Sequence, residues 1–288
     1  MSVDTSLTQN NIFSVYDLPT MTDSEYKKLA GLIQSYSGIY LKDAKQALLA
    51  NRLSGVLAQE GYKDFSDYYN KLIADKSGSA IAELVEKITT NHTFFMREAA
   101  HFDYFRQVVL PYLEKTVTSK DLRIWCAACS TGEEAYTLAM ILDEYFANNK
   151  LLWDSKVLAT DLSMKVLRDA SKGVYTKDRI DPLPPLWKQK YFAPYGNDLC
   201  EVSPRLKNEV IFRRFNLIEK VYPFKKKFHC IFCRNVMIYF DNETKDNIIN
   251  KLYDATEPGG YLFIGHSEAL DREKTKYKYV MPAVYRKI

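Results

Sequence analysis

The chain has 288 residues, of which 40 are lysine or arginine and 36 are aspartate or glutamate, giving a formal net charge of +4. Hydrophobic residues make up 47% and charged residues 26%, which fits a soluble globular protein and excludes intrinsic disorder as the main state. The small net charge gives no support for nucleic-acid binding. No stretch approaches the roughly 20 apolar residues of a membrane span, and the polar N-terminus lacks signal-peptide features. We therefore expect a cytoplasmic protein whose five cysteines form no disulfide framework.

The N-terminal third of the chain contains only helical patterns. Residues 1–20 show no periodicity and are expected to form a flexible tail. Within residues 21–90, apolar side chains recur three and four positions apart over 26–33, 48–56 and 84–88, and glycines separate these segments. No β-rich run interrupts them. We predict a small all-α domain over residues 21–90.

After residue 90 the pattern changes to strands that alternate with helices. The predicted strands cover residues 122–127, 156–161, 228–233 and 261–265. The predicted helices cover residues 133–146, 164–172 and 242–256. This alternation is typical of βαβ units and predicts an α/β domain with a mostly parallel sheet. Residues 175 to about 215 are rich in proline and aromatic residues, break the alternation, and are expected to form an inserted lobe.

The turn after the first predicted strand is the central motif. Residues 125–134 read Trp-Cys-Ala-Ala-Cys-Ser-Thr-Gly-Glu-Glu. Their small side chains would let a ligand approach the backbone. A phosphate-binding P-loop is excluded because no lysine follows Gly132, and the dinucleotide motif lacks its further glycines. Glu133 and Glu134 would repel a pyrophosphate but tolerate a cationic ligand such as S-adenosylmethionine. The alternative is a plain strand-turn-helix in which Thr131 with Glu134, or Ser130 with Glu133, forms a capping box.

Asp161 ends the second predicted strand, 161 − 132 = 29 residues after Gly132. A carboxylate at this position can accept hydrogen bonds from the two hydroxyls of a ribose. The alternative is that Asp161 or Ser163 caps the helix that begins near Met164. A cap and a ribose contact do not exclude each other. With the upstream motif in view, we favour the ribose contact.

Two cysteine pairs have the spacing of a zinc site. Cys126 and Cys129 form one pair, and Cys230 and Cys233 form the other. A zinc knuckle places each pair on a tight turn, whereas these pairs begin inside predicted strands, where residues three apart point to opposite faces. We expect buried free thiols and no metal.

Several motif blocks together resemble the CheR family of chemotaxis receptor glutamate O-methyltransferases. The blocks are Thr-Thr-Asn-His-Thr-Phe-Phe-Met-Arg-Glu at 89–98, Ser-Thr-Gly-Glu-Glu at 130–134, Phe-Cys-Arg-Asn-Val-Met-Ile-Tyr-Phe at 232–240, and Gly-His-Ser-Glu at 265–268. Their order and spacing agree with the family from about residue 22 to 287. The resemblance implies an α/β fold: a class I, Rossmann-like S-adenosylmethionine-dependent methyltransferase domain over 91–288. It also implies a small inserted β-subdomain at about 176–212 and an all-α N-terminal domain in front.

The resemblance also implies the site and the reaction. The cofactor contacts that carry over are Asn91, Thr93, Arg97, Glu134, Asp161, Asn216, Leu217, Asn235 and Val236. Arg97 is the candidate catalytic clamp for a carboxylate of either the substrate or the cofactor, and Tyr239 is the candidate hydrogen-bond donor near the acceptor. The implied reaction moves a methyl group from S-adenosylmethionine to receptor glutamates, leaving S-adenosylhomocysteine. The implied partners are the cytoplasmic methylation helices of transmembrane chemoreceptors. The sequence itself does not report the oligomeric state, so we take a monomer as the default, and we expect no nucleic-acid partner.

The chain departs from the family pattern in ways that affect docking. Residues 54–58 lack the arginine cluster that some members turn toward the receptor. Residues 191–206 are shorter than in members that bind a receptor C-terminal pentapeptide tether, and they lack the Gly-x-Gly loop, so we predict no tether dependence. Two other functions remain open. An amino-group methyltransferase would want prolines in the loop at 235–238, and a catalytically idle regulatory module would bind the cofactor without turnover.

Overall fold

The computed structural model describes residues 19–288, so most of the predicted tail at 1–20 lies outside the described residues. Two compact units divide the chain. One contains the residues up to 32 and residues 41–88, and the other contains residues 33–40 and 89–288. Within residues 19–288, every helix is too short or too polar to cross a bilayer.

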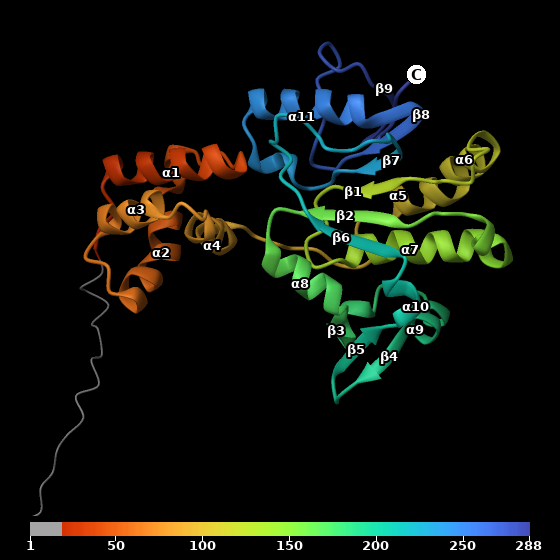
Figure 1. Ribbon diagram of the computed structural model, residues 1–288, viewed down its shortest axis with the longest axis horizontal. Helices are drawn as coiled ribbons and strands as arrows, with labels where there is room; N and C mark the ends of the chain where they lie inside the picture. The colour runs from red at the N-terminus through yellow and green to blue at the C-terminus, as the bar shows by residue number, and fades with distance from the viewer. Residues whose placement is uncertain (1–18) are drawn as a thin grey trace, which may run out of the picture. The chain divides into compact units, whose positions relative to one another are not determined.

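The smaller unit is built from helices, as the apolar spacing predicts (Figure 1). Its helices are α1 (Asp23–Ser37), α2 (Gln46–Glu60), α3 (Phe65–Ala74) and α4 (Ser79–Ile88), with a short 3-10 helix η1 (Asp43–Lys45) before α2. The last turn of α1 groups with the larger unit. Gly61, in the left-handed conformation, ends α2, and Asp64 caps α3 by accepting the Asp67 amide at 2.8 Å. Leu29, Leu53 and Phe65 are fully buried in the core of this unit.

The larger unit is organised around a seven-stranded sheet of order β6-β2-β1-β7-β8-β10-β9 (Figure 1). The strands are β1 (Ile124–Cys126), β2 (Val157–Asp161), β6 (Val210–Arg214), β7 (Phe228–Phe232), β8 (Thr256–Phe263), β9 (Lys278–Met281) and β10 (Val284–Arg286). From β6 to β8 all neighbours are parallel, while β10 runs antiparallel to both β8 and β9. The predicted α/β fold with a mostly parallel sheet is confirmed.

Helices cover both faces of this sheet because alternate residues of its strands are buried in different clusters. Cys126 of β1 packs in a core with Leu138 of α7, whereas Trp125 packs on the other face with Ile248 of α11. The long helices are α7 (Glu133–Phe146), α8 (Met164–Lys172) and α11 (Asn242–Ala255). The shorter helical segments are α5 (Ala99–Tyr104), η2 (Phe105–Val109, a π-helix), α6 (Leu110–Thr116), η3 (Ala147–Leu152) and η5 (Met237–Tyr239).

A small antiparallel sheet of order β3-β5-β4 forms the inserted lobe. Its elements are β3 (Val174–Thr176), η4 (Lys177–Ile180), α9 (Pro185–Tyr191), β4 (Phe192–Tyr195), β5 (Leu199–Val202) and α10 (Pro204–Lys207). The sheet therefore spans residues 174–202. The predicted boundary near 212 falls inside β6, which pairs with β2 in the main sheet, Val157 opposite Val210. Only the four-residue helix α10 lies between β5 and β6, so the sequence gives little sign of where the lobe ends.

Gly132 gives a test of the packing beside α7. An alanine Cβ at Gly132 would lie 2.9 Å from Cβ of Ala170 and 3.0 Å from Oη of Tyr175, at φ +98°. We expect Gly132→Ala to lower the free energy of unfolding by roughly 3 kcal/mol, because left-handed strain and overpacking add. Urea unfolding of the full chain, followed by tryptophan fluorescence, measures it.

The matched control is Gly196→Ala in the turn between β4 and β5. Gly196 is also left-handed, at φ +72°, but no heavy atom lies within 4 Å of its built Cβ. Gly196→Ala should lower the free energy of unfolding only by the cost of the left-handed backbone, about 1–2 kcal/mol. Equal losses in the two variants would show that space around residue 132 does not limit the substitution.

Candidate functional site

The carboxyl ends of parallel strands β1, β2 and β7 lie at one edge of the main sheet, and predicted site residues Glu134, Asp161 and Asn235 lie at or soon after these strand ends (Figure 1). Cys126 at the end of β1 is opposite Ala159 of β2 and Phe232 of β7, so the three carboxyl ends lie side by side. In open α/β sheets this edge is where ligands bind. The loops that follow β1 and β7 carry two of the four blocks on which the family resemblance rests, and the block at 265–268 follows β8.

The loop after β1 is held tightly against its neighbours. The Ala127 amide donates to the Phe232 carbonyl at 2.8 Å, and the Cys129 amide donates to the Thr160 carbonyl at 2.9 Å. Ser130 and Gly132 both have positive φ, which turns the chain sharply into α7. The resulting backbone cradle is bounded by small side chains and the start of a helix.

The capping boxes suggested by the sequence do not form. Gly132 is the N-cap of α7, and no side chain caps it. The Thr131 hydroxyl instead donates to Glu133 at 2.7 Å. The reason is the left-handed conformation of Gly132, which moves the helix start one or two residues later than the capping boxes require.

Both glutamates at the start of α7 are neutralised by arginines. Glu133 is fully buried and pairs with Arg179 of the inserted lobe. Glu134 pairs with Nη1 of Arg234 at 2.6 Å and accepts the Cys126 thiol at 3.1 Å. The sequence suggested two carboxylates facing a cationic ligand. Glu133 instead joins the lobe to the main domain, and only Glu134 remains partly exposed.

Arg234, which the sequence analysis did not single out, lies buried at the centre of the site. Its guanidinium binds Glu134, Glu98 at 2.8 Å and the Arg97 carbonyl at 2.6 Å, and stacks over Phe102. Burial opposes its charge, yet Glu134 and Glu98 raise the pKa of Arg234 above its usual value. The sequence did contain a signal for this ion pair: Arg234 is the one charged residue of the mostly apolar 232–240 block, and Glu98 ends the 89–98 block.

Asp161 connects the ends of β1 and β2. One carboxylate oxygen accepts the Ser130 amide at 2.9 Å, and the other accepts the Ser163 amide at 3.0 Å. Ser163, not Asp161, is the N-cap of α8, since its hydroxyl accepts the Val166 amide. Asp161 is half-buried at the strand end, where the sequence predicted it.

The segment at 90–97 lies beside the β1 loop. The Ser130 hydroxyl donates to the Asn91 carbonyl at 3.4 Å, and the Tyr239 hydroxyl donates to the Thr90 carbonyl at 3.2 Å. Arg97 is half-buried and donates from Nη1 to the His92 carbonyl at 2.7 Å. Tyr239 lies in η5 rather than at a strand end, and it is also half-buried. Both predicted catalytic side chains are thus held by the same short segment.

Asn216 and Leu217 follow β6 at the same edge. The Phe215 amide donates at 2.9 Å to the carbonyl of Asp161, the last residue of β2. Asn216, the next residue along the chain, therefore lies just past the end of that strand. The Asn216 side chain donates to the Tyr36 carbonyl at 2.8 Å. The Leu217 side chain is buried in the core around Trp125, so a ligand contact at this position would have to use the backbone.

Asn235 and Val236 are positioned by the loop after β8. Asn235 is left-handed, and its side chain donates to Glu98 at 3.2 Å. Glu268 accepts the backbone amides of Asn235, Met237 and Gly265 at 2.6–3.0 Å. Burial raises the pKa of Glu268, and these amide hydrogen bonds oppose that shift. The Gly-His-Ser-Glu block therefore fixes the loop that carries Asn235.

The cysteines are buried free thiols, as expected. Cys126 is in β1 and Cys230 is in β7. Burial raises the pKa of Cys126, Cys129, Cys230 and Cys233 well above the usual thiol value, so these side chains are protonated at neutral pH.

Comparison with known proteins identifies the two parts of the chain. The model of the CheR methyltransferase SAM-binding domain matches residues 91–285, where SAM is S-adenosylmethionine, and the model of the CheR methyltransferase all-alpha domain matches residues 24–89. The chemotaxis protein methyltransferase of Borreliella burgdorferi is 43% identical over 270 residues, covering 93% of this chain and 95% of that protein. The chemotaxis protein methyltransferase of Escherichia coli is 34% identical over 273 residues, covering 92% of this chain and 91% of that protein.

Both domain models match in the order that the fold displays, and the relatives align over nearly the whole chain. The resemblance drawn from the motif blocks is thereby confirmed. This chain belongs to the CheR methyltransferase family, with an all-α N-terminal domain and a SAM-binding methyltransferase domain.

Proposed function

We propose that this protein transfers the methyl group of S-adenosylmethionine to glutamate side chains of chemoreceptors, forming glutamate methyl esters. The observation that carries the proposal is the hydrogen bond from the Ser130 amide to Asp161. It joins the two strand-end loops of a SAM-binding domain into one cradle. The names of the relatives, chemotaxis protein methyltransferases, supply the substrate class.

The residues at this edge fit the chemical parts of the cofactor. Asp161 would accept the ribose hydroxyls, because its carboxylate is fixed by the Ser130 and Ser163 amides at the carboxyl end of β2, where an acidic side chain suits that contact. Glu134, held by Arg234, would face the cationic amino-acid end. The remaining contacts that we propose are Asn91, Thr93, Arg97, Asn216, Leu217, Asn235 and Val236. The small side chains of the β1 loop leave room for a ligand against the backbone.

When bound, S-adenosylmethionine supplies an electrophilic methyl group on a sulfonium. The proposed acceptor is a glutamate carboxylate, whose ordinary pKa of about 4.3 makes it an anion at neutral pH, so the chain need supply no general base. What the chain must do is orient the carboxylate and exclude water.

Arg97 is the proposed clamp. Its backbone carbonyl is fixed by buried Arg234, while its partly exposed guanidinium has the fork geometry that binds a carboxylate through two nitrogens. Tyr239 is the proposed hydrogen-bond donor beside the acceptor. We also propose that the enzyme acts as a monomer in the cytoplasm, where the methylation helices of the receptors lie.

Asp161→Asn tests the cofactor contact. The amide keeps one acceptor oxygen but loses the charge, so the Kd for S-adenosylhomocysteine should rise about tenfold, which corresponds to one charged hydrogen bond. Isothermal titration calorimetry of the full chain measures it. Asp169→Asn, at an exposed position in α8, is the control and should leave the Kd unchanged. Equal affinities in both variants would remove Asp161 from the cofactor site.

Arg97→Ala tests the reaction itself. With methyl-labelled S-adenosylmethionine and receptor-containing membranes, we expect methyl groups that base releases as methanol, since carboxyl methyl esters hydrolyse and N-methyl groups do not. Losing a two-nitrogen clamp should lower kcat/KM about 100-fold, and Arg97→Lys should recover only part of it. Arg106→Ala, at an exposed position in η2, is the control. Base-stable counts in the wild type would instead indicate an amino-group methyltransferase.

The lobe gives a prediction about docking. Only the turn 196–198 joins β4 to β5, and it has no Gly-x-Gly loop. We expect a peptide made of the last five residues of a tether-bearing receptor to bind with a Kd weaker than about 1 mM, a free energy of about −4 kcal/mol or less favourable. Calorimetry with the full chain tests this, and a micromolar complex would show that the enzyme uses a tether after all.

A further inference from the structure

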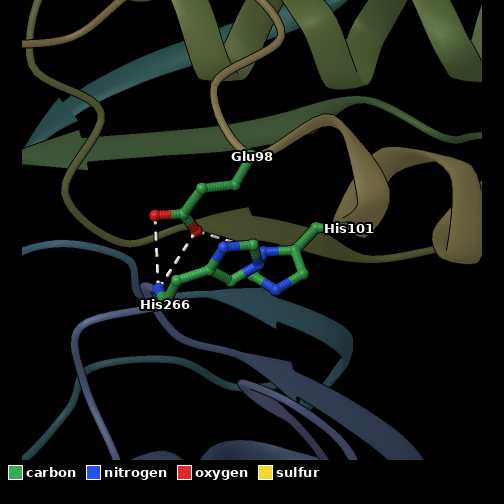
Figure 2. A group of neighbouring side chains, drawn as sticks. All are labelled: Glu98, His101 and His266. Atoms are coloured by element: carbon green, nitrogen blue, oxygen red, sulfur yellow. Dashed lines mark hydrogen bonds and ion pairs between the residues drawn. The ribbon is translucent and has the colours of Figure 1, made fainter.

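Glu98, His101 and His266 meet beside the proposed cofactor site without being part of it (Figure 2). Glu98 and His101 come from the start of α5, and His266 comes from the loop after β8. Each offers one ligand atom, and these atoms all lie within 4.8 Å of one another. Two imidazoles and a carboxylate form the ligand set of many zinc sites.

His101 is buried with little polar contact. Its side chain is fully buried, and neither ring nitrogen meets strict hydrogen-bond geometry, although the Pro282 backbone interacts with the ring. Its Nδ1 lies 3.5 Å from Oε2 of Glu98. A neutral imidazole nitrogen can donate a lone pair to a metal ion. Buried polar groups favour a partner, and an ion between His101 and Glu98 would supply one.

Glu98 supplies the negative charge. Its carboxylate pairs with Arg234 at 2.8 Å and accepts the Asn235 side-chain amide at 3.2 Å. Its carboxylate also accepts the His266 backbone amide, at 3.2 Å to each oxygen. Glu98 itself is left-handed at φ 57°, a conformation that points its side chain into this group.

His266 gives the group an opening to solvent. Its residue is exposed, and its ring lies edge-on to that of His101, with 4.6 Å between the centroids. An ion could therefore enter from water, bind His266 first and then reach the buried His101. A free coordination position facing solvent would remain for water.

We propose that Glu98, His101 and His266 bind a divalent transition-metal ion of the zinc class, and that the bound ion weakens cofactor binding. The claim that the ion weakens cofactor binding rests on the proposed function. Oε2 of Glu98 lies 2.8 Å from Nη2 of Arg234, so an ion on that carboxylate competes with the guanidinium. Arg234 also holds Glu134, which we assign to the cofactor. Ion and cofactor must then weaken each other by the same factor.

Zinc binding to untagged full-length protein, measured by equilibrium dialysis, tests the first half. We expect one Zn²⁺ per chain, with the Kd raised at least about tenfold in His266→Ala, because an exposed ligand is removed without disturbing the core. His92→Ala, also at an exposed histidine but outside the group, is the control and should bind as the wild type does. Absence of binding, or equal binding in His266→Ala, would overturn the site.

Titration of S-adenosylhomocysteine with and without saturating Zn²⁺ tests the second half. At a Zn²⁺ concentration that saturates the wild type but lies below the zinc Kd of His266→Ala, the Kd for S-adenosylhomocysteine should rise at least about fivefold in the wild type and should change little in the variant. An unchanged Kd in zinc-loaded wild type would overturn the competition. Failure of S-adenosylhomocysteine to bind even without Zn²⁺ would count against the proposed function and the competition, and the dialysis would still decide the metal site.

Discussion

The buried guanidinium of Arg234 is the interaction on which the geometry of the site depends. It joins the neighbouring residues Arg97 and Glu98 to Glu134 of α7, and all three lie far from Arg234 in the sequence. Taking such a charge out of water is unfavourable unless charged partners and hydrogen bonds surround it, and here two carboxylates and a carbonyl do so. Without the guanidinium, Glu98 and Glu134 would lose their common counterion. The start of α5 and the start of α7 would then no longer be joined through Arg234.

The pairing of buried charges also determines which carboxylate is available to a ligand. Glu133 is neutralised by Arg179, and Glu268 is occupied by backbone amides. Asp161 accepts the backbone amides of Ser130 and Ser163, which hold its carboxylate in place at the end of β2. A carboxylate fixed in this way is suited to accept hydroxyl hydrogen bonds, since it need not reorganise when a ligand arrives.

The fold and the location of the site could be predicted from the sequence because both depend on local periodicity. Alternating strands and helices indicate a parallel sheet, and its carboxyl edge is then the place to look for ligand contacts. The charge balance could not be predicted this way. Arg179 lies 46 residues from Glu133, and Arg234 lies 100 residues from Glu134, so no local pattern reports either pair. The end of the lobe is hard to locate from the sequence for a similar reason, because the pairing of Val210 with Val157 is a long-range contact.

The segment at 90–97 connects cofactor binding to substrate orientation. Its carbonyls at Thr90 and His92 hold the side chains of Tyr239 and Arg97, the two proposed catalytic residues. Between them, the Asn91 carbonyl contacts Ser130 in the proposed cofactor cradle. Because one short stretch of backbone makes all three contacts, it cannot shift at one of them without shifting at the others. Ordering of the cradle by the cofactor would therefore also order the clamp that meets the acceptor carboxylate, which favours binding of the cofactor before the receptor.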